Sequence, residues 1–470
     1  MEHLRRRLLL SARAKLGAII LFSVVIRLGF CLVVFPAISK EPLVQGHDRY
    51  DDIARNLLHG SGYALDPAGP PTIKRLPLYP LLLYATYAVA GEHLRATQLV
   101  QVFLAAVTTW LIFLIGRIVF SETVGLLAAA FFSVHPHLIQ YTARPYTETL
   151  YVFLICLLAY LLLLDIPGPA PRRNGLIAGG VFGLTILTKG VAIGFPAFFF
   201  LGWLLHPSHR KSLSPLGKYL LFFVIGAAII VSPWAYRNYA LTGRVILTST
   251  WEGAPLYHGL YVGSNLGDGR SPGALDRAAS LEREQIVDKE LGRIHNAIDE
   301  HRADRLAHSL AFKKILDSPY RAGMLFLRNL VLVWFLTRST LFTYLGFFLH
   351  LSLLGLSLYG LIWMVRHDRE GLGKIWPVAS LIIYFTVIYA IAYPFVRYVL
   401  PVAPLMMVLA SFGMVKILNL EGPSPSIQTK SGARKPSTGS VLTPSHRRAE
   451  GRLRSPVNLE RPEPLRECRS

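Results

Sequence analysis

The sequence has few charged residues and very few cysteines for a chain of 470 residues. Charged side chains make up 16% and hydrophobic ones 52%, and the mean hydropathy is +0.42, which excludes an ordinary soluble protein of this size. Cys31 and Cys156 lie in apolar segments and Cys468 lies at the end of the chain, so neither a disulfide framework nor a cysteine-based metal cluster is expected. The sequence also lacks a glycine-rich phosphate loop between a strand and a helix, which argues against a bound nucleotide sugar.

Basic residues outnumber acidic ones, giving a formal net charge of +21. They gather in short segments that alternate with apolar runs, as the positive-inside rule predicts for cytoplasmic loops of a membrane protein. No basic cluster is interleaved with aromatic residues, so nucleic acid is not an expected partner. The clusters are Arg5–Arg7, Arg172–Arg173, His209–Lys211, Arg366–Arg369 and the tail after residue 420.

Apolar runs near the ~20 residues needed to cross a bilayer recur along the chain. The first, residues 16–38, lacks a clear cleavage site and is interpreted as a retained signal-anchor helix. Two shorter runs, at 76–91 and 324–336, are expected to lie at the membrane surface. The sequence therefore predicts an all-α polytopic membrane protein with about ten transmembrane helices plus surface helices. The other predicted spans are 96–118, 121–140, 147–165, 175–189, 191–206, 217–235, 341–365, 375–392 and 399–418.

The charge pattern predicts three parts: a cytoplasmic basic N-terminus (1–15), a transmembrane domain (16–420) and a disordered cytoplasmic tail (421–470). The protein is then expected in the inner or plasma membrane of the cell, with both termini in the cytoplasm. The loops 39–95 and 236–340 are expected to be external.

The second external loop is expected to be partly ordered. Residues 242–269 mix β-branched residues with glycines, which predicts strand and loop, and residues 276–315 show helical spacing of apolar side chains, which predicts an amphipathic helix.

Every conspicuous polar motif falls on the predicted external side. "HDRYDDIARNLLHGSGY" contains Asp48, Asp51 and Asp52, and "TARPYTET" is expected to place Arg144 and Glu148 one helical turn apart at the mouth of a span. "WAYRNYALTGRV" and "YPFVRYVLPVAP" add further cations beside apolar runs. This one-sided clustering predicts a functional site at the outer membrane surface.

A carboxylate beside several cations at a lipid interface suits transfer of a lipid-phosphate-linked sugar. Cations bind the phosphate and stabilise the leaving group, and a carboxylate can act as general base toward an acceptor hydroxyl or amine. Several of these residues also have a structural explanation. Asp51 and Asp52 can cap a helix, and Arg144 and Glu148 can form a structural i,i+4 pair. Lys189 can extend from a short helix to the membrane surface, and His258 can be a loop residue rather than a metal ligand.

Six motifs together resemble a known family. "YDDIARNLLHGSGY" after Asp48, then "KRLPLYPLLL", "RPYTETLY", "LTKG", "PWAYRNYALTG" and "RYVLPVAP", are similar in type and order to motifs of GT-C type integral-membrane glycosyltransferases. The resemblance is to the glycosyltransferase family 39 group, which includes protein O-mannosyltransferases and aminoarabinose transferases of lipid A. It covers residues 16 to 418 and implies a GT-C fold.

The resemblance also implies roles for individual residues. It places the catalytic acid at Asp48, with Asp51 and Asp52 as alternatives, because the spacing of the aminoarabinose branch would put the acid at Gly46. The cations implied around the donor phosphate are Lys74, Arg75, Lys189, Arg237 and Arg397, and further site candidates are Arg144, Glu148 and Tyr398.

The expected function is therefore sugar transfer from a polyprenyl-phosphate donor to an envelope acceptor (lipid, polysaccharide or protein) at the outer face of the membrane. No cofactor is assigned; a divalent metal is left open, with His258 as a weak candidate ligand. The alternatives are a lipid or glycan transporter or flippase, for which charges near the bilayer midplane and inverted repeats would be expected, and a polysaccharide ligase or polymerase.

Overall fold

The computed structural model describes residues 2–38, 48–165, 170–205, 213–251, 253–368 and 371–420. This part of the chain is almost entirely helical and contains no strand, which confirms the all-α prediction. The predicted disordered tail lies outside the described residues. In chain order the helices are α1 (Glu2–Gly29), a π-helical turn (Phe30–Val34), α2 (Phe35–Ile38), α3 (Tyr50–Leu58), α4 (Leu78–Ala90), α5 (Leu94–Val119), α6 (Glu122–Val134), α7 (Pro136–Thr142), α8 (Glu148–Asp165), α9 (Pro171–Ile186), a 3-10 turn (Gly190–Gly194), α10 (Phe195–Leu205), α11 (Leu213–Thr242), α12 (Gly253–Asn265), α13 (Pro272–Leu291), α14 (Ala297–Asp317), α15 (Pro319–Leu332), α16 (Thr340–His367), α17 (Gly371–Lys374), α18 (Trp376–Ala392), α19 (Val396–Val399), a 3-10 turn (Leu400–Val402) and α20 (Ala403–Leu418).

Among the described residues, five helical segments are long and apolar enough to cross a membrane, and α6 with α7 makes a sixth if this bent pair is one span. Four further apolar helices are shorter, so the predicted count of about ten spans is not confirmed. The five long segments are Ala12–Ile38, Leu94–Val119, Leu216–Thr242, Gly346–His367 and Val396–Leu418; the four shorter helices are Leu78–Ala90, Glu148–Leu164, Gly190–Leu204 and Trp376–Ala392.

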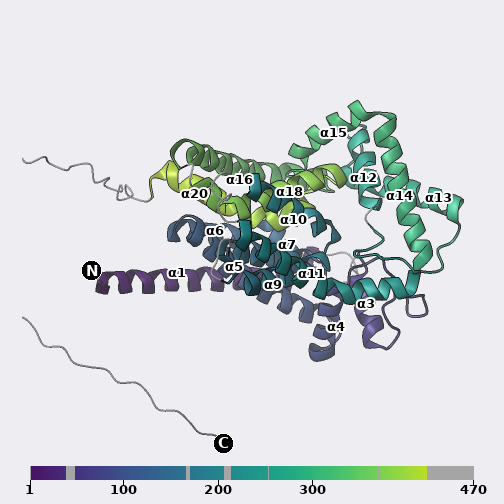
Figure 1. The fold of residues 1–470 in the computed structure, drawn as a ribbon, viewed down its shortest axis with the longest axis horizontal. Coiled ribbons are helices and arrows are strands. Elements are labelled where there is room, and N and C mark those ends of the chain that lie inside the picture. The colour runs from purple at the N-terminus through teal and green to yellow at the C-terminus, as the bar shows by residue number, and fades with distance from the viewer. Residues whose placement is uncertain are drawn as a thin grey trace, which may run out of the picture. The chain divides into compact units, whose positions relative to one another are not determined.

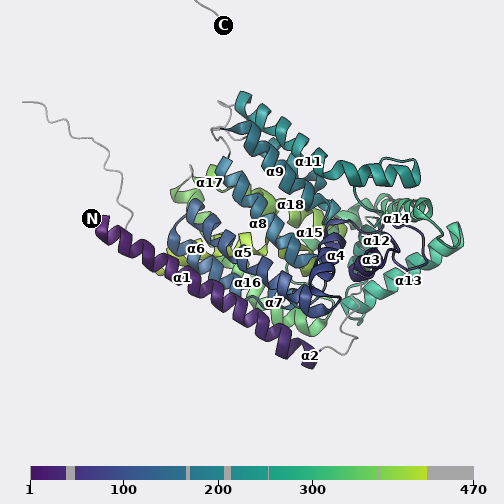
Figure 2. The same ribbon diagram turned by 90° about the horizontal axis from the view of Figure 1, so that it is seen from below.

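The last long helix, α20, lies inside the helical bundle. It is apolar on all sides, as expected of a helix surrounded by others, and it contacts α5, α6, α8, α16 and α18. In the most apolar stretch of Val396–Leu418, 89% of the residues are buried, against 22% for Ala12–Ile38. Figure 2 accordingly shows α1 along the edge of the bundle. The chain just before α20 is therefore held by a rigid core.

Helices α9 and α11 pack with almost no space between their backbones. Gly175, Gly179 and Gly183 recur every four residues, so they share one face of α9 and let α11 approach closely. A Cβ atom on Gly179 would lie 2.0 Å from the carbonyl oxygen of Phe223. The close packing of α9 against α11 fixes the end of α9 and therefore the start of the segment 187–190, which carries Lys189.

The predicted span at 121–140 is a pair of helices bent by 59°, because Pro136 cannot continue the hydrogen bonding of α6. The buried guanidinium of Arg27, from α1, donates to the carbonyl oxygens of Ser133 at 3.2 Å and Phe132 at 3.1 Å. It also donates to the hydroxyl of Ser23 at 2.6 Å. Pro136 has no N–H to donate to the carbonyl oxygen of Phe132, and Arg27 supplies additional donors to the carbonyl groups at the bend.

We expect Arg27→Ala to lower the free energy of unfolding by roughly 1.5–3 kcal/mol, the usual value of hydrogen bonds that involve a charged group. Thermal unfolding of the detergent-purified protein measures this. Arg13, on the same helix but exposed, provides the control. Equal melting temperatures for Arg27→Ala and Arg13→Ala would contradict the assigned role.

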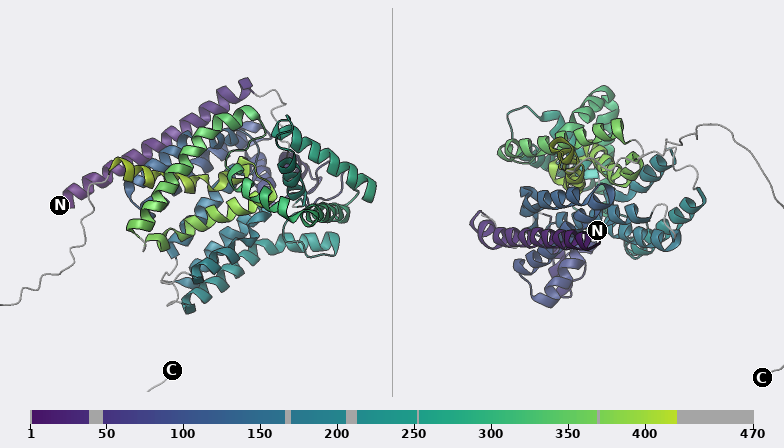
Figure 3. Two further views of the ribbon diagram at one scale, coloured as in Figure 1. Left: turned by 90° about the horizontal axis from the view of Figure 1, so that it is seen from above. Right: turned by 90° about the vertical axis from the view of Figure 1, so that its left-hand side faces the viewer.

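The helices within residues 236–340, the predicted second external loop, gather at one end of the bundle, and α3 lies at the same end (Figures 1 and 2). The left view of Figure 3 shows these helices, in teal and green, at the end of the bundle opposite the N-terminus. The amphipathic helix predicted at 276–315 forms two helices, α13 and α14. The surface helix predicted at 324–336 corresponds to α15, whose 14 residues are too few to cross a bilayer.

The strand predicted within residues 242–269 is wrong, because Gly253–Asn265 forms the buried helix α12. Its glycines serve close packing: a Cβ atom on Gly253 would lie 2.5 Å from the Asp304 carbonyl oxygen, and one on Gly259 would lie 2.1 Å from that of Ala392. Gly253 and Gly259 are therefore contact points of a helix, whereas Gly243, Gly267 and Gly269 lie outside it with positive φ, as expected of turns.

Candidate active site

Asp48 lies in a turn just before α3. The residue between them, Arg49, has φ 57°, in the left-handed region that non-glycine residues seldom adopt. The Arg49 side chain holds this turn by ion pairs to Asp52 at 2.7 Å and Asp66 at 2.6 Å. The carbonyl oxygen of Asp48 accepts a hydrogen bond from Nε of Arg75 at 2.8 Å. The sequence around Asp48 thus fixes the direction of its carboxylate.

The Asp48 carboxylate forms an ion pair with Nη2 of Arg397. Burial acts to raise the pKa of Asp48, but the charges of Arg397 and Arg75 outweigh it and hold the pKa well below its usual value. Asp48 is therefore ionised at neutral pH, and its side chain keeps 25% of its surface exposed. This combination leaves the carboxylate charged and accessible.

Glu148 binds the same arginine from the other side. It is the first residue of α8 and is completely buried. Its Oε1 accepts hydrogen bonds from Nε of Arg397 at 2.6 Å and from Nζ of Lys189 at 3.1 Å. Because an unpaired buried charge is very costly, these two cations are required by Glu148. Asp48, Arg397, Glu148 and Lys189 form one ion-pair chain that joins four separate segments.

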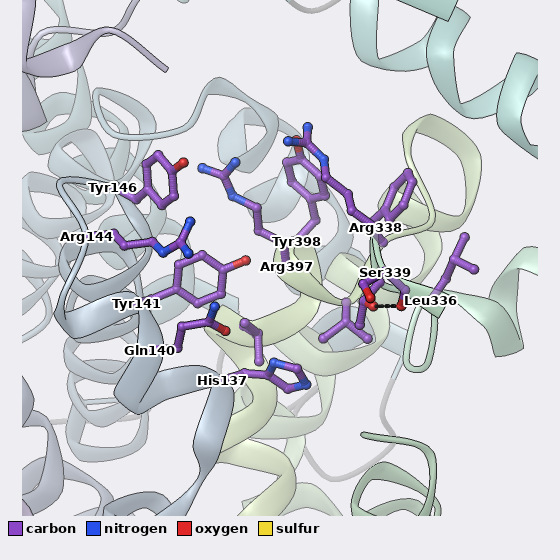
Figure 4. A pocket seen from close by; sticks show the side chains of 14 residues that line it. His137, Gln140, Tyr141, Arg144, Tyr146, Leu336, Arg338, Ser339, Arg397 and Tyr398 are labelled. Carbon is purple, nitrogen blue, oxygen red and sulfur yellow. Dashed lines mark hydrogen bonds between the residues drawn. The ribbon is translucent and has the colours of Figure 1, made fainter. Parts of the chain in front are cut away.

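A cavity of about 250 Å³ opens beside this chain. Figure 4 shows Arg397 pointing toward Tyr146, with Arg144 and Tyr141 beside it and Arg338 on the opposite side. None of the described residues that line it is acidic, so it suits an anion. Its lining residues are His137, Gln140, Tyr141, Arg144, Tyr146, Leu336, Thr337, Arg338, Ser339, Phe395, Val396, Arg397, Tyr398 and Leu400.

Arg338 is a site residue that the sequence reasoning missed. It is held by Asp276 of α13, whose carboxylate lies 3.0 Å from Nη2 of Arg338 and 3.3 Å from Nδ1 of His258. The hydroxyl of Tyr393 also donates to Asp276. These four residues come from four distant segments, so no local motif marks Arg338.

Asp276 makes the folded protein less stable at acid pH. Burial raises its pKa, but His258, Tyr393 and Arg338 together lower it below its ordinary value. The ionised Asp276 carboxylate therefore stabilises the folded protein fully above about pH 3.9, the pKa of Asp in the unfolded chain. This contribution is lost as the pH falls through the lower pKa of Asp276 in the folded protein.

We expect Asp276→Asn to cost about 1.5–3 kcal/mol at pH 7 and to reduce the loss of stability below about pH 4. Melting temperatures between pH 3 and pH 7 measure both effects. Parallel curves for wild type and variant, with the same drop in acid, would contradict the role given to Asp276.

The alternative acids lie elsewhere. Asp52 pairs with Arg49, and Asp51 is buried on α3; neither lines the cavity. Of the three first-loop carboxylates, the structure thus brings only Asp48 to Arg397.

Of the five predicted phosphate-binding cations, four do not line this cavity; Lys189 is linked to it only through Glu148 and Arg397, and the other three lie elsewhere. Lys74 lines a separate pocket of about 280 Å³. The Arg75 guanidinium lies over Tyr50 and Trp251, at 5.6 and 5.0 Å from the ring centroids. The Arg237 guanidinium donates to the carbonyl oxygens of Thr72 and Tyr63 and so connects α11 to the segment between α3 and α4.

The expected pairing of Arg144 with Glu148 on one helix is wrong. Helix α7 ends at Thr142 and α8 begins at Glu148, so Arg144 falls in the non-helical connection. Its guanidinium lies 5.6 Å from the Phe35 ring centroid, and the residue lines the cavity. The ring of Tyr398 lies 5.3 Å from Nζ of Lys189, so this candidate does belong to the cluster.

His258 contacts Asp276 rather than a group of potential metal ligands. Within the described ranges, no three or more His, Cys, Asp or Glu side chains are arranged to hold a metal ion.

Part of the chain, with some of the site residues, matches the model of a known protein family. Residues 71–236 match the family model described as dolichyl-phosphate-mannose-protein mannosyltransferase. No curated protein matches the sequence.

Several solved structures are similar to this chain, among them two of an archaeal oligosaccharyltransferase and one of ArnT. The Archaeoglobus fulgidus oligosaccharyltransferase in the apo form shares 14% identity and a TM-score of 0.53, over 86% of this chain and 51% of that one. The oligosaccharyltransferase AglB from the same organism, with an inhibitory peptide and a dolichol-phosphate, shares 14% identity and a TM-score of 0.52, over 86% and 50%. ArnT from Cupriavidus metallidurans in the apo state shares 13% identity, over 83% and 77%, but its TM-score of 0.38 is too low to carry an argument.

This chain spans about half the length of the archaeal oligosaccharyltransferase, whose likeness establishes the fold alone. The matched segment contains five residues of the described network or its surroundings: Lys74, Arg75, Arg144, Glu148 and Lys189. The resemblance drawn from the six motifs is thereby confirmed: the chain is a multi-pass membrane protein with a GT-C type fold, and its residues 71–236 match the dolichyl-phosphate-mannose-protein mannosyltransferase model.

Proposed function

We propose that this protein transfers a sugar from a polyprenyl-phosphate-linked donor to an envelope acceptor at the outer face of the membrane. One observation carries the proposal: three arginines, Arg144, Arg338 and Arg397, meet at a cavity without acidic lining residues, and one of them is paired with Asp48. Arginine is well suited to a phosphate because its N–H groups match the phosphate oxygens in pairs.

The proposed reaction is a direct displacement. An acceptor hydroxyl or amine attacks the anomeric carbon of the donor sugar, and the bond from that carbon to the phosphate oxygen breaks. The electron pair leaves with the polyprenyl phosphate, whose charge is stabilised by the cavity arginines. Asp48 takes the proton of the acceptor as general base.

The comparisons support the class of donor. The family model matched by residues 71–236 is named for a dolichyl-phosphate-linked mannose donor, and AglB was solved with a dolichol-phosphate. Both are polyprenyl-type lipid phosphates, which place the phosphate at the membrane interface and the chain in lipid. The acceptor class of this protein is a lipid, a polysaccharide or a protein.

The test is an assay of purified protein in lipid nanodiscs with polyprenyl-phosphate sugars and, separately, with nucleotide sugars. Mass spectrometry of envelope glycolipids and glycoproteins from cells with and without the gene identifies the acceptor. We expect transfer only from the lipid-linked donors. Transfer from a nucleotide sugar in lipid-free detergent would refute the proposal.

Outer-face chemistry requires a defined orientation, which single cysteines can test. We expect a membrane-impermeant thiol reagent to label Ser61→Cys and Ser264→Cys from outside intact cells, and Ser440→Cys only after the membrane is opened. The reason is the alternation of basic segments, which predicts cytoplasmic termini. Labelling of all three positions from the same side would contradict this orientation.

A further inference from the structure

Arg397 holds two carboxylates at once. Its Nε bonds Glu148 at 2.6 Å, and its Nη2 pairs with Asp48. The same guanidinium lines the cavity proposed for the donor phosphate. The cation that the phosphate needs is therefore already engaged by the proposed general base.

The geometry of the guanidinium makes the two uses incompatible. Arginine binds a phosphate most strongly through two parallel N–H bonds from neighbouring nitrogens. Glu148 holds Nε, so a paired contact toward the cavity has to use Nη1 and Nη2. Nη2 is the nitrogen that bonds Asp48. A phosphate and the Asp48 carboxylate thus require the same nitrogen, and their negative charges repel each other.

We propose that the donor phosphate displaces Asp48 from Arg397, so that Asp48 is released as a base only when the donor occupies the cavity. This inference rests on the proposed function. Glu148 and Lys189 keep Arg397 in place during the exchange, because the fully buried Glu148 cannot lose its partner. Arg75 stays on the carbonyl oxygen of Asp48 and keeps the turn in position.

The charge state of Asp48 fits such a switch. In this structure, burial acts to raise the pKa of Asp48, but the charges of Arg397 and Arg75 and the hydrogen bond from Arg397 together more than reverse this effect. A carboxylate held in this way accepts protons poorly. When Arg397 turns to a phosphate, burial is opposed by fewer charges, the pKa rises, and Asp48 becomes a stronger base. Binding of the donor would thereby prepare the base.

The test measures binding rather than turnover, using a polyprenyl phosphate without a sugar and the full-length protein in nanodiscs. If Asp48 competes for Arg397, Asp48→Asn should bind this lipid about tenfold more tightly than wild type, the usual effect of removing a charged hydrogen bond. The gain should vanish when the same substitution is made in an Arg397→Gln background. Asp268→Asn removes a comparable ion pair, to Arg270, on an exposed loop and should change nothing.

The outcomes separate the competing explanations. Weaker or unchanged binding by Asp48→Asn, with a wild-type melting temperature, would overturn the switch, because it means that Asp48 positions Arg397 or has no influence on it. An equal gain in the Arg397→Gln background would also overturn it, since any negative charge near the phosphate could act in that way. If neither wild type nor any variant binds the lipid, the proposed function fails and the inference fails with it.

Discussion

Asp48→Asn is expected to lower kcat for sugar transfer by about 10²–10⁴, the usual loss when a general base is removed. The substitution keeps the shape of the side chain and removes its charge, so Arg397 loses one partner and retains Glu148. Protein amount and melting temperature should therefore stay near wild type. The measurement is single-turnover transfer from a polyprenyl-phosphate sugar at saturating acceptor.

The neighbouring carboxylates provide the matched controls for this prediction. Asp51→Asn and Asp52→Asn should cost much less in kcat, because these side chains lie on α3 and do not contact Arg397. Near-normal turnover of Asp48→Asn, together with an inactive Asp51→Asn or Asp52→Asn, would move the base to one of the neighbours and reject the role assigned to Asp48.

Arg397→Gln is expected to act on both donor use and folding. Loss of a cation that bonds an ionised phosphate costs roughly 1.5–3 kcal/mol, or a ten- to hundredfold loss in kcat/KM for the donor. Loss of the main partner of the buried Glu148 should lower the free energy of unfolding by about 3–5 kcal/mol. The donor titration and the melting temperature report the two effects separately.

Two further variants sharpen the prediction for Arg397. Arg397→Lys keeps the charge but offers one ammonium group, which cannot make the two separate bonds to Asp48 and Glu148, so it should recover only part of the loss. Arg270→Gln breaks the exposed pair with Asp268 and should leave both readouts unchanged. Full activity and normal melting of Arg397→Gln would show that this arginine has neither role.

The parts of the fold that were predictable from the sequence depend on local pattern. The long apolar runs gave α5, α11, α16 and α20 within a few residues, because a bilayer-length run has few alternatives to a helix. Asp48 and Arg397 were singled out by the resemblance of the motifs around them to those of a known family.

The missed features depend on contacts between distant segments. Helix α12 looked like loop because glycine is a poor helix former, yet Gly259 faces the backbone of α18, where any larger residue would clash. Arg338 reaches the cavity through Asp276, 62 positions earlier in the chain, and no spacing rule reports such a pair. Arg237 resembled a phosphate ligand because its carbonyl partners, Thr72 and Tyr63, are invisible in a linear reading.

The position of Arg27 has a consequence for biosynthesis. The carbonyl oxygens that it binds belong to residues 105 and 106 positions later in the chain. At about 5–20 residues per second, the ribosome needs roughly 5–20 s to deliver them. For that interval the first helix carries a guanidinium without its final partners, which opposes full entry into lipid. The first helix should therefore wait in a hydrated position or within the insertion machinery, and settle in the bilayer only when α6 arrives.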